Sequence, residues 1–396
     1  MLGNRATGRT MGRISRGEPL VLDLTGPTSH TVHIEAGQGS FALGPVGMKV
    51  GKLDAVVAPD AAINWAAFDG MTGPAGYPWP RFFYYQGNDI GFAAWSYTRH
   101  IDNFTWLPSS AERLDVADAR IGQLSLHLAG TPLDLVLGGI HDLSIAGDLS
   151  GLNVRCDEGR TLPSLAVAPV AVPRSQVYTL PSLSALAGIS RLSISVDALA
   201  APFDCESLLQ FSSLQHLQLE GNMTNLPALA QLPELQDLAL RFCPNLTGLP
   251  ELETFRKLTS FIGWNIEARS GKALRGQLRK LEASGRVKNY SSVAKLRAPA
   301  WFVTEYRLPF ATWPRKRAAQ ASKAHKQAAA AIAEARSIEA VQTVVVAFVE
   351  VINTLPNIET SEREDVGVGI DRLAALAPMG VPPDVAQGWF DAVRDF

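Results

Sequence analysis

The 396-residue chain has few cysteines, little net charge and no long apolar run. Its three cysteines, Cys156, Cys205 and Cys243, are an odd number, and no two of them lie close together in sequence. Such a pattern argues against a disulfide framework or a thiolate zinc site and is typical of reduced thiols in a cytoplasmic protein. The net charge of −2 gives no global reason to expect a nucleic-acid or membrane partner.

A membrane anchor is not expected either. The longest apolar run lies within residues 341–352 and includes Gln342, Thr343 and Glu350, so it is too short and too polar to cross a bilayer. Residues 1–17 carry four arginines without a following apolar segment, which predicts a disordered basic lead-in and no secretion signal. We therefore expect a cytoplasmic protein with no membrane partner.

Motifs for catalysis and cofactor binding are also missing. The chain contains no G-x-G-x-x-G, no H-E-x-x-H and no G-x-S-x-G, and its seven histidines are scattered. The closest pair, His30 and His33, is separated by three positions on a predicted strand, so the two side chains point to opposite faces. We predict that the protein is not an enzyme and has no catalytic residue, metal ion or cofactor.

A repeated pattern of leucines is the clearest positive feature. Residues 214–222 and 235–243 both read L-x-x-L-x-L-x-x-N/C, and 189–197 and 258–263 are weaker copies. The starts of successive copies are 25, 21 and 23 residues apart. This pattern resembles the leucine-rich repeat family, of bacterial type, and the resemblance is strong only over 189–265. It implies a solenoid in which each repeat forms one coil with a short strand.

A shorter rhythm precedes these copies. From residue 111 a leucine-x-apolar triplet returns about every nine or ten residues. Each triplet could form one rung of a tight solenoid, or successive triplets could form the two faces of longer coils. Both alternatives extend the predicted repeat region to 111–265.

The flanking segments predict different structures. Residues 18–110 are rich in glycine, proline and aromatics, and predict a β-rich cap domain packed by its aromatic side chains. Residues 266–314 predict a basic capping helix followed by an aromatic connector. Residues 315–396 predict an α-helical bundle whose helices begin near positions 315, 338, 360 and 383. The predicted fold class is therefore α/β, an irregular leucine-rich-repeat-like solenoid with an N-terminal β-rich cap and a C-terminal α-helical bundle.

The residues between the leucines are the candidates for binding. In L-x-x-L-x-L the leucines point into the core and the intervening residues point outward, because side chains alternate along a strand. The resemblance implies that a partner binds this outward, concave face. Aligning the four copies gives three outward columns of charged, polar and aromatic residues. The predicted protein-binding residues are Arg191, His216, Gln218, Glu220, Asp237, Arg241, Ile262 and Trp264.

These features favour a non-catalytic protein–protein interaction module. The family resemblance suggests a bacterial toxin as the partner, which the chain would neutralise as an immunity or antitoxin protein. A first alternative is a secreted effector or enzyme-targeting protein in which the solenoid recognises a substrate. The apolar stripe of Val341, Val345 and Phe348 could mediate a homodimer, although an intramolecular core is the favoured role of such a stripe.

Charge is distributed unevenly along the chain. Residues 256–326 contain 17 lysines and arginines against three acids, a net charge of +14, so the remaining residues carry −16. A basic block interleaved with Trp301, Tyr306 and Trp313 predicts a second alternative, a nucleic-acid-associated protein that contacts phosphates and stacks on bases. A solvated capping face is favoured over it, because no nucleic-acid-binding motif accompanies the block.

Overall fold

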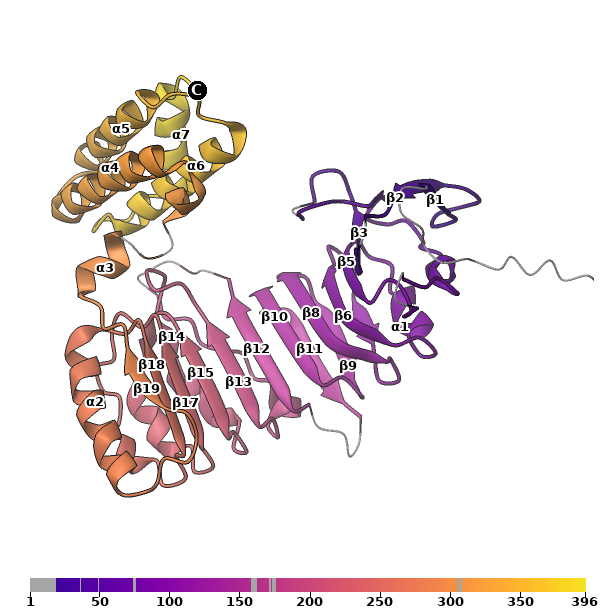
Figure 1. Cartoon of the computed structure of the whole chain (residues 1–396), viewed down its shortest axis with the longest axis horizontal. Coiled ribbons are helices and arrows are strands. Elements are labelled where there is room, and N and C mark those ends of the chain that lie inside the picture. The colour runs from indigo at the N-terminus through magenta and orange to yellow at the C-terminus, as the bar shows by residue number, and fades with distance from the viewer. Residues whose placement is uncertain are drawn as a thin grey trace, which may run out of the picture.

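Figure 1 shows a computed structural model of the chain. It describes residues 19–396 apart from 36, 49, 74–75, 158–161, 171, 173–175, 305 and 307. The basic lead-in predicted for 1–17 lies outside the described residues. The described part is an α/β structure with one large parallel sheet and a group of C-terminal helices.

The central sheet has twelve strands, all parallel to their neighbours. From its N-terminal edge they are β4 (Ala55–Val56), β3 (Ser40–Gly44), β5 (Phe82–Gln86), β6 (Ile101–Leu107), β8 (Ile121–Ala129), β10 (Asp142–Asp148), β12 (Ser164–Pro169), β13 (Arg191–Ser195), β15 (His216–Glu220), β17 (Asp237–Arg241), β18 (Ser260–Trp264) and β19 (Ser292–Ala294). Apart from β4, the strands lie side by side in chain order. One face of this sheet packs on the main hydrophobic core. We call the other face the open face.

The predicted fold class is wrong. The sequence predicted a separate β cap over 18–110, followed by a leucine-rich-repeat-like solenoid over 111–265. The structure is instead an α/β protein in which one twelve-stranded, all-parallel central sheet runs through both regions, and the C-terminal helices follow it.

The aromatic segment joins the sheet because aromatic rings fill the buried positions that leucines fill later. In register across β5, β6 and β8, the buried pairs are Phe83 and Tyr85, Phe104 and Trp106, and Leu124 and Leu126. The buried positions are thus in register in all three strands, but they hold aromatic residues in β5 and β6 and leucines in β8. A search for a leucine pattern therefore does not detect that β5 and β6 belong to the same sheet as β8.

The short rhythm from residue 111 alternates between two sheets. β8, β10 and β12 belong to the central sheet, whereas β7 (Arg113–Asp115), β9 (Leu133–Leu137) and β11 (Leu152–Cys156) form a separate parallel sheet of three strands. Leucines of both sheets belong to one hydrophobic core. Of the two alternatives, the one in which successive triplets form two faces is therefore confirmed.

Short 3-10 helices follow the later strands and cover the same side of the sheet. They are η3 (Cys205–Gln210), η4 (Leu226–Gln231) and η5 (Leu252–Thr254), which bury Leu208, Leu229 and Leu252 in the main core. Helix α2 (Ala268–Ala283) covers the last strands with Leu274, Leu278 and Leu281. The smaller elements are the hairpin β1 (Pro19–Leu22) and β2 (His30–His33), η1 (Trp65–Phe68), α1 (Gly91–Trp95), η2 (Ser184–Leu186), and the pair β14 (Phe203–Asp204) and β16 (Met223–Thr224).

The C-terminal helices pack around their own core. They are α4 (Arg315–Glu334), α5 (Ile338–Asn353), α6 (Thr360–Leu376) and α7 (Pro383–Val393), which begin close to the predicted positions. The Ser337 side chain caps α5 by accepting a hydrogen bond from the N–H of Ala340. The stripe of Val341, Val345 and Phe348 is buried inside this core, which is the intramolecular role that the sequence favoured for it.

A small apolar cluster joins these helices to the sheet. The connector contains α3 (Pro299–Thr304) and η6 (Pro309–Thr312), and its Phe302 and Tyr306 pack with Leu199 and Phe242. The rings of Phe242 and Tyr306 lie 5.1 Å apart. Leu199 and Phe242 belong to the loops after β13 and β17, so the helices contact the sheet beyond the carboxyl ends of its strands (Figure 1).

Replacing Gly221 with alanine should destabilise the sheet by about 3 kcal/mol, because a strained backbone angle and a steric clash add together. Gly221 has a φ of +100°, and a Cβ there would lie 1.9 Å from the carbonyl oxygen of Val196. Urea unfolding measures the change. The control is Gly276→Ala on α2, where an added Cβ meets nothing within 4 Å and the helix should gain about 0.5–1 kcal/mol. Equal stability of the two variants would contradict the assigned backbone.

The buried His325 should make the C-terminal helices sensitive to acid. Its side chain has no exposed surface, its Nε2 donates a hydrogen bond to the carbonyl of Gly369 at 3.0 Å, and desolvation lowers its pKa to about 4. An unfolded histidine titrates near pH 6.5, so the unfolded state binds the proton first as pH falls. Stability is therefore fully present above about pH 6.5 and declines toward pH 4, by about 3 kcal/mol in total.

The variant His325→Gln keeps a hydrogen-bond donor but removes the titrating group. The difference in unfolding free energy between pH 7 and pH 4.5 should therefore be smaller in the variant than in the parent, as followed by helix circular dichroism in urea. Identical pH profiles for the two proteins would show that His325 is not buried as a neutral ring.

Candidate functional site

The open face carries its side chains in three rows, because the parallel register places equivalent positions of neighbouring strands beside one another. Across β13, β15, β17 and β18, the first row is Arg191, His216, Asp237 and Ser260, the second is Ser193, Gln218, Ala239 and Ile262, and the third is Ser195, Glu220, Arg241 and Trp264. These are the columns that the sequence predicted. All eight predicted binding residues therefore lie together on one face.

Alternation along each strand determines which residues reach this face. In β15, Leu217 and Leu219 are buried in the core, whereas His216, Gln218 and Glu220 are partly exposed on the other side. β13 and β17 repeat the pattern, and β18 repeats it at Ile262 and Trp264, whereas its first residue, Ser260, is buried. Burial of the leucines thus fixes the outward position of the polar residues without any contact among the polar residues themselves.

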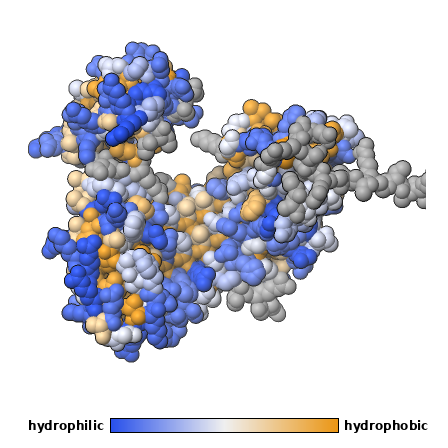
Figure 2. Space-filling view, viewed as in Figure 1, coloured by the Kyte–Doolittle hydropathy of each residue, from blue (hydrophilic) through white to orange (hydrophobic). Residues whose placement is uncertain are grey.

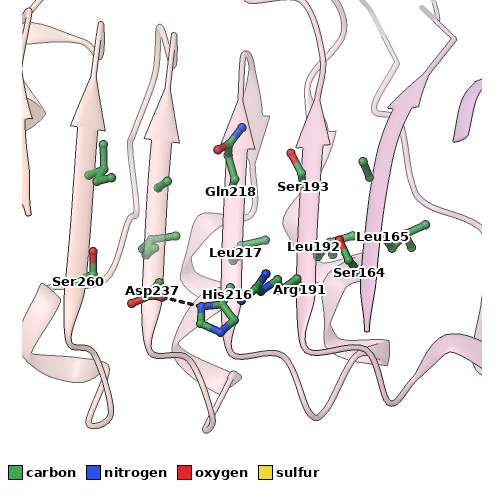
Figure 3. Close-up of a pocket in the computed structure, with 14 residues that line it drawn as sticks. Ser164, Leu165, Arg191, Leu192, Ser193, His216, Leu217, Gln218, Asp237 and Ser260 are labelled. Atoms are coloured by element: carbon green, nitrogen blue, oxygen red, sulfur yellow. Dashed lines mark hydrogen bonds and ion pairs between the residues drawn. The ribbon is translucent and has the colours of Figure 1, made fainter. Parts of the chain in front are cut away.

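A close polar pair lies in the first row. Nδ1 of His216 is 2.5 Å from Oδ2 of Asp237, and the two side chains are 33% and 34% exposed. Arg191 stands beside His216 on the neighbouring strand (Figure 3). A pair this exposed contributes at most about 1 kcal/mol to stability. These three residues can therefore vary with little effect on the fold.

A shallow groove of about 430 Å³ crosses the first two rows. The side chains of Arg191, His216 and Gln218 stand along it (Figure 3), and the short side chains of Ala166 and Ala239 also line it. Long polar side chains beside short ones make this part of the face concave. It can therefore accept a projecting side chain or loop and supply both hydrogen-bond donors and acceptors.

The third row lies at the carboxyl ends of the strands, close to the contact with the C-terminal helices. Arg241 is followed directly by Phe242, whose ring packs on Tyr306. Hydrogen bonds of 3.0 Å from the N–H of Gly221 to the carbonyl of Arg241, and from the N–H of Phe242 to that of Trp264, hold these strand ends together. Nε of Arg241 is buried and donates no hydrogen bond within the described residues.

The same rows continue over β12, β10 and β8 and then over β6 and β5, where the sequence predicted a separate cap. The first row extends through Phe82, Asn103, Gln123, Asp142 and Ser164, and the second through Tyr84, Thr105, Ser125, Ser144 and Ala166. Phe82 and Tyr84 are 41% and 43% exposed. The sequence signal for them was the alternation in 82–85, where every second aromatic is buried. A second hollow, of about 680 Å³, is lined by Tyr84, His127 and Lys52.

The basic segment 256–326 does not form one surface. Most of its exposed cations lie on two helices that belong to different cores: Arg269, Lys272, Arg275, Arg279 and Lys280 on α2, and Arg315, Lys316, Lys323 and Lys326 on α4. The others, Arg256, Lys257, Lys288 and Lys295, are exposed outside these helices. Tyr306 and Trp313 are buried at 1% and 5% exposure. The expectation that these two aromatics stack on bases is therefore wrong, because they pack the connector.

The described residues offer no other obvious chemistry. They contain no group of three histidine, cysteine or acidic side chains that could hold a metal ion. None of their helices has the length and apolar character needed to cross a membrane. Cys156, Cys205 and Cys243 are free, and burial raises the pKa of Cys205 and of Cys243 to about 12, which makes both thiols unreactive.

Comparison with models of known protein families, with curated proteins and with solved structures found no match. The leucine pattern therefore remains a resemblance carried by its own residues. What supports a function is the geometry of the open face.

Outward and inward positions of the same strands should respond differently to truncation. The combined change of Glu220, Arg241 and Trp264 to alanine should alter the unfolding free energy by less than about 1.5 kcal/mol, since outward positions usually contribute within about 0.5 kcal/mol each. The single inward change Leu219→Ala should cost about 3 kcal/mol through lost burial and a cavity. Urea unfolding of both variants tests this, and a larger loss in the outward variant would contradict the assignment of faces.

Proposed function

We propose that this chain is a non-catalytic protein–protein interaction module that binds a protein partner on the open face of its central sheet. The observation that carries the proposal is the alignment of the eight candidate residues in three rows on one face. They combine a cation, an anion, a hydrogen-bonded pair and a tryptophan within four neighbouring strands. Interfaces are built from this mixture, with arginine and tryptophan as frequent anchors.

The size of the face also supports the proposal. Nine strands from β5 to β18 carry the rows. At about 4.8 Å between strands, and with strands about 17 Å long, they form a surface of about 650 Å². A standard interface buries about 800 Å² on each partner. The open face therefore needs only a small contribution from neighbouring loops or from the C-terminal helices.

The partner class that we infer is a bacterial toxin, held by this chain as an immunity protein in the cytoplasm. This inference rests on the resemblance of 189–265 to bacterial leucine-rich repeats and on the finding that the three cysteines are not joined in disulfides. The partner would reach the face from the side opposite the leucine core.

The combined variant Glu220→Ala, Arg241→Ala and Trp264→Ala should lose the partner, because it removes an acid, a base and an aromatic anchor from one row. Immobilised wild-type and variant proteins are compared on lysate of the source cells by quantitative mass spectrometry, and the captured protein is then purified and titrated. We expect a loss of affinity of at least about 30-fold, the effect of removing one strong anchor.

A matched control changes one acid, one arginine and one aromatic away from the open face: Glu282→Ala, Arg279→Ala and Tyr97→Ala. All three side chains are exposed. The control should retain the partner at wild-type affinity. Equal retention by both variants would refute the open face as the binding surface.

A further inference from the structure

Helix α2 presents a basic surface that the proposed protein interaction does not use. Its apolar side chains Leu274, Leu278 and Leu281 are buried against the last strands of the sheet. Its opposite side exposes five cations to solvent: Arg269, Lys272, Arg275, Arg279 and Lys280. Figure 2 shows a strongly hydrophilic surface along this edge of the molecule.

The five cations form one stripe. At 100° per residue, they fall within an arc of about 140°, and from Arg269 to Lys280 the stripe is about 16 Å long. Arg275 donates a hydrogen bond from Nε to the carbonyl of Val293 at 2.9 Å. Across the described ranges, the side chains of Arg269, Lys272, Arg279 and Lys280 make no hydrogen bond or ion pair. Arg269 is attracted electrostatically to Glu267, whose carboxylate caps the helix, whereas Lys272, Arg279 and Lys280 have no such partner among the described residues.

The stripe has no apolar anchors. None of the exposed large hydrophobic side chains lies on α2. Between the cations the helix carries Gly276 and alanines, and a Cβ at Gly276 would meet nothing within 4 Å. A protein interface uses aromatic or aliphatic anchors, and a helix that lies on a membrane inserts bulky apolar residues. A chain of phosphates needs only accessible cations, and these are what the helix supplies.

We propose that the exposed side of α2 binds the phosphate backbone of single-stranded nucleic acid without sequence preference. The cations lie in one straight stripe about 16 Å long, which matches the backbone of one extended strand. The single amide side chain on α2, Gln277, already accepts a hydrogen bond from the N–H of Leu252 at 2.9 Å, and so it is not free to read base edges. This function goes beyond the proposed protein interaction, and its surface is separate from the three rows of the open face.

The binding should be strongly dependent on salt. With four cations of the stripe on phosphates, the slope of log K against log salt should be about −3 for a single strand. Fluorescence anisotropy of a labelled 20-nucleotide oligothymidine should therefore show affinity falling about 50-fold between 50 and 200 mM NaCl. Absence of salt-sensitive binding at 50 mM would overturn the proposal.

The test variant is Arg269→Gln, Lys272→Gln, Arg279→Gln and Lys280→Gln, which should lower affinity at 50 mM salt at least tenfold. The control variant has the same change in net charge at exposed positions of α4 and of the turn between α4 and α5: Arg315→Gln, Lys316→Gln, Lys323→Gln and Arg336→Gln. It should bind within twofold of wild type. Equal losses in the two variants would show that net charge alone attracts the oligonucleotide, and would overturn the assignment to α2. Circular dichroism verifies that both variants are folded.

Three further probes distinguish the occupant: a 20-base-pair duplex, poly-L-glutamate and phosphatidylserine vesicles. Tighter binding of any of them through the α2 cations would replace single-stranded nucleic acid with duplex, an acidic protein segment or a membrane surface, and would overturn the proposal. The variant of Glu220, Arg241 and Trp264 should bind the oligonucleotide like wild type. Failure of the protein interaction and failure of nucleic-acid binding can therefore be told apart.

Discussion

The structure depends on one constraint: each strand of the central sheet must place its alternate apolar side chains in the same core as its neighbours do. Because the strands are parallel and in register, an inward residue of one strand always lies beside an inward residue of the next. A slip by one residue would turn leucines outward and polar residues inward. The order of the outward rows is therefore a consequence of packing on the opposite side of the sheet.

Much of the local structure could be predicted from the sequence. The four copies of the leucine pattern predicted the positions of β13, β15, β17 and β18. They also predicted the columns of outward residues, since spacing along a strand determines which side chains share a face. Helices α4 to α7 were also predicted, because their composition and caps act within a few residues of one another. These features depend on interactions that are local in sequence or that repeat at a fixed period.

The parts that could not be predicted depend on contacts that the repeat does not encode. Phe83 and Tyr85 fill the same layer as Leu124 and Leu126, but a change of residue type conceals the shared position until the strands are seen in register. The leucine-x-apolar triplets from residue 111 alternate between two sheets, and this alternation depends on where each connecting turn changes the direction of the chain. Short turns have only a weak signature in the sequence. The basic residues of 256–326 are continuous in sequence, but most of them lie on two separate surfaces. The reason is that the connector at 299–314 carries the chain from the core of the sheet to the core of the C-terminal helices.

Phe242 illustrates how closely two surfaces can share one piece of backbone. It has a positive φ of 50°, uncommon for a bulky residue, at the point where the chain leaves β17. Arg241, one position earlier, belongs to the open face, whereas the Phe242 ring holds Tyr306 in the contact with the helices. A residue of the proposed binding surface and a residue of the contact with the C-terminal helices are thus encoded by adjacent codons. Sequence changes at this end of the open face are therefore restricted to those that keep the neighbouring turn intact.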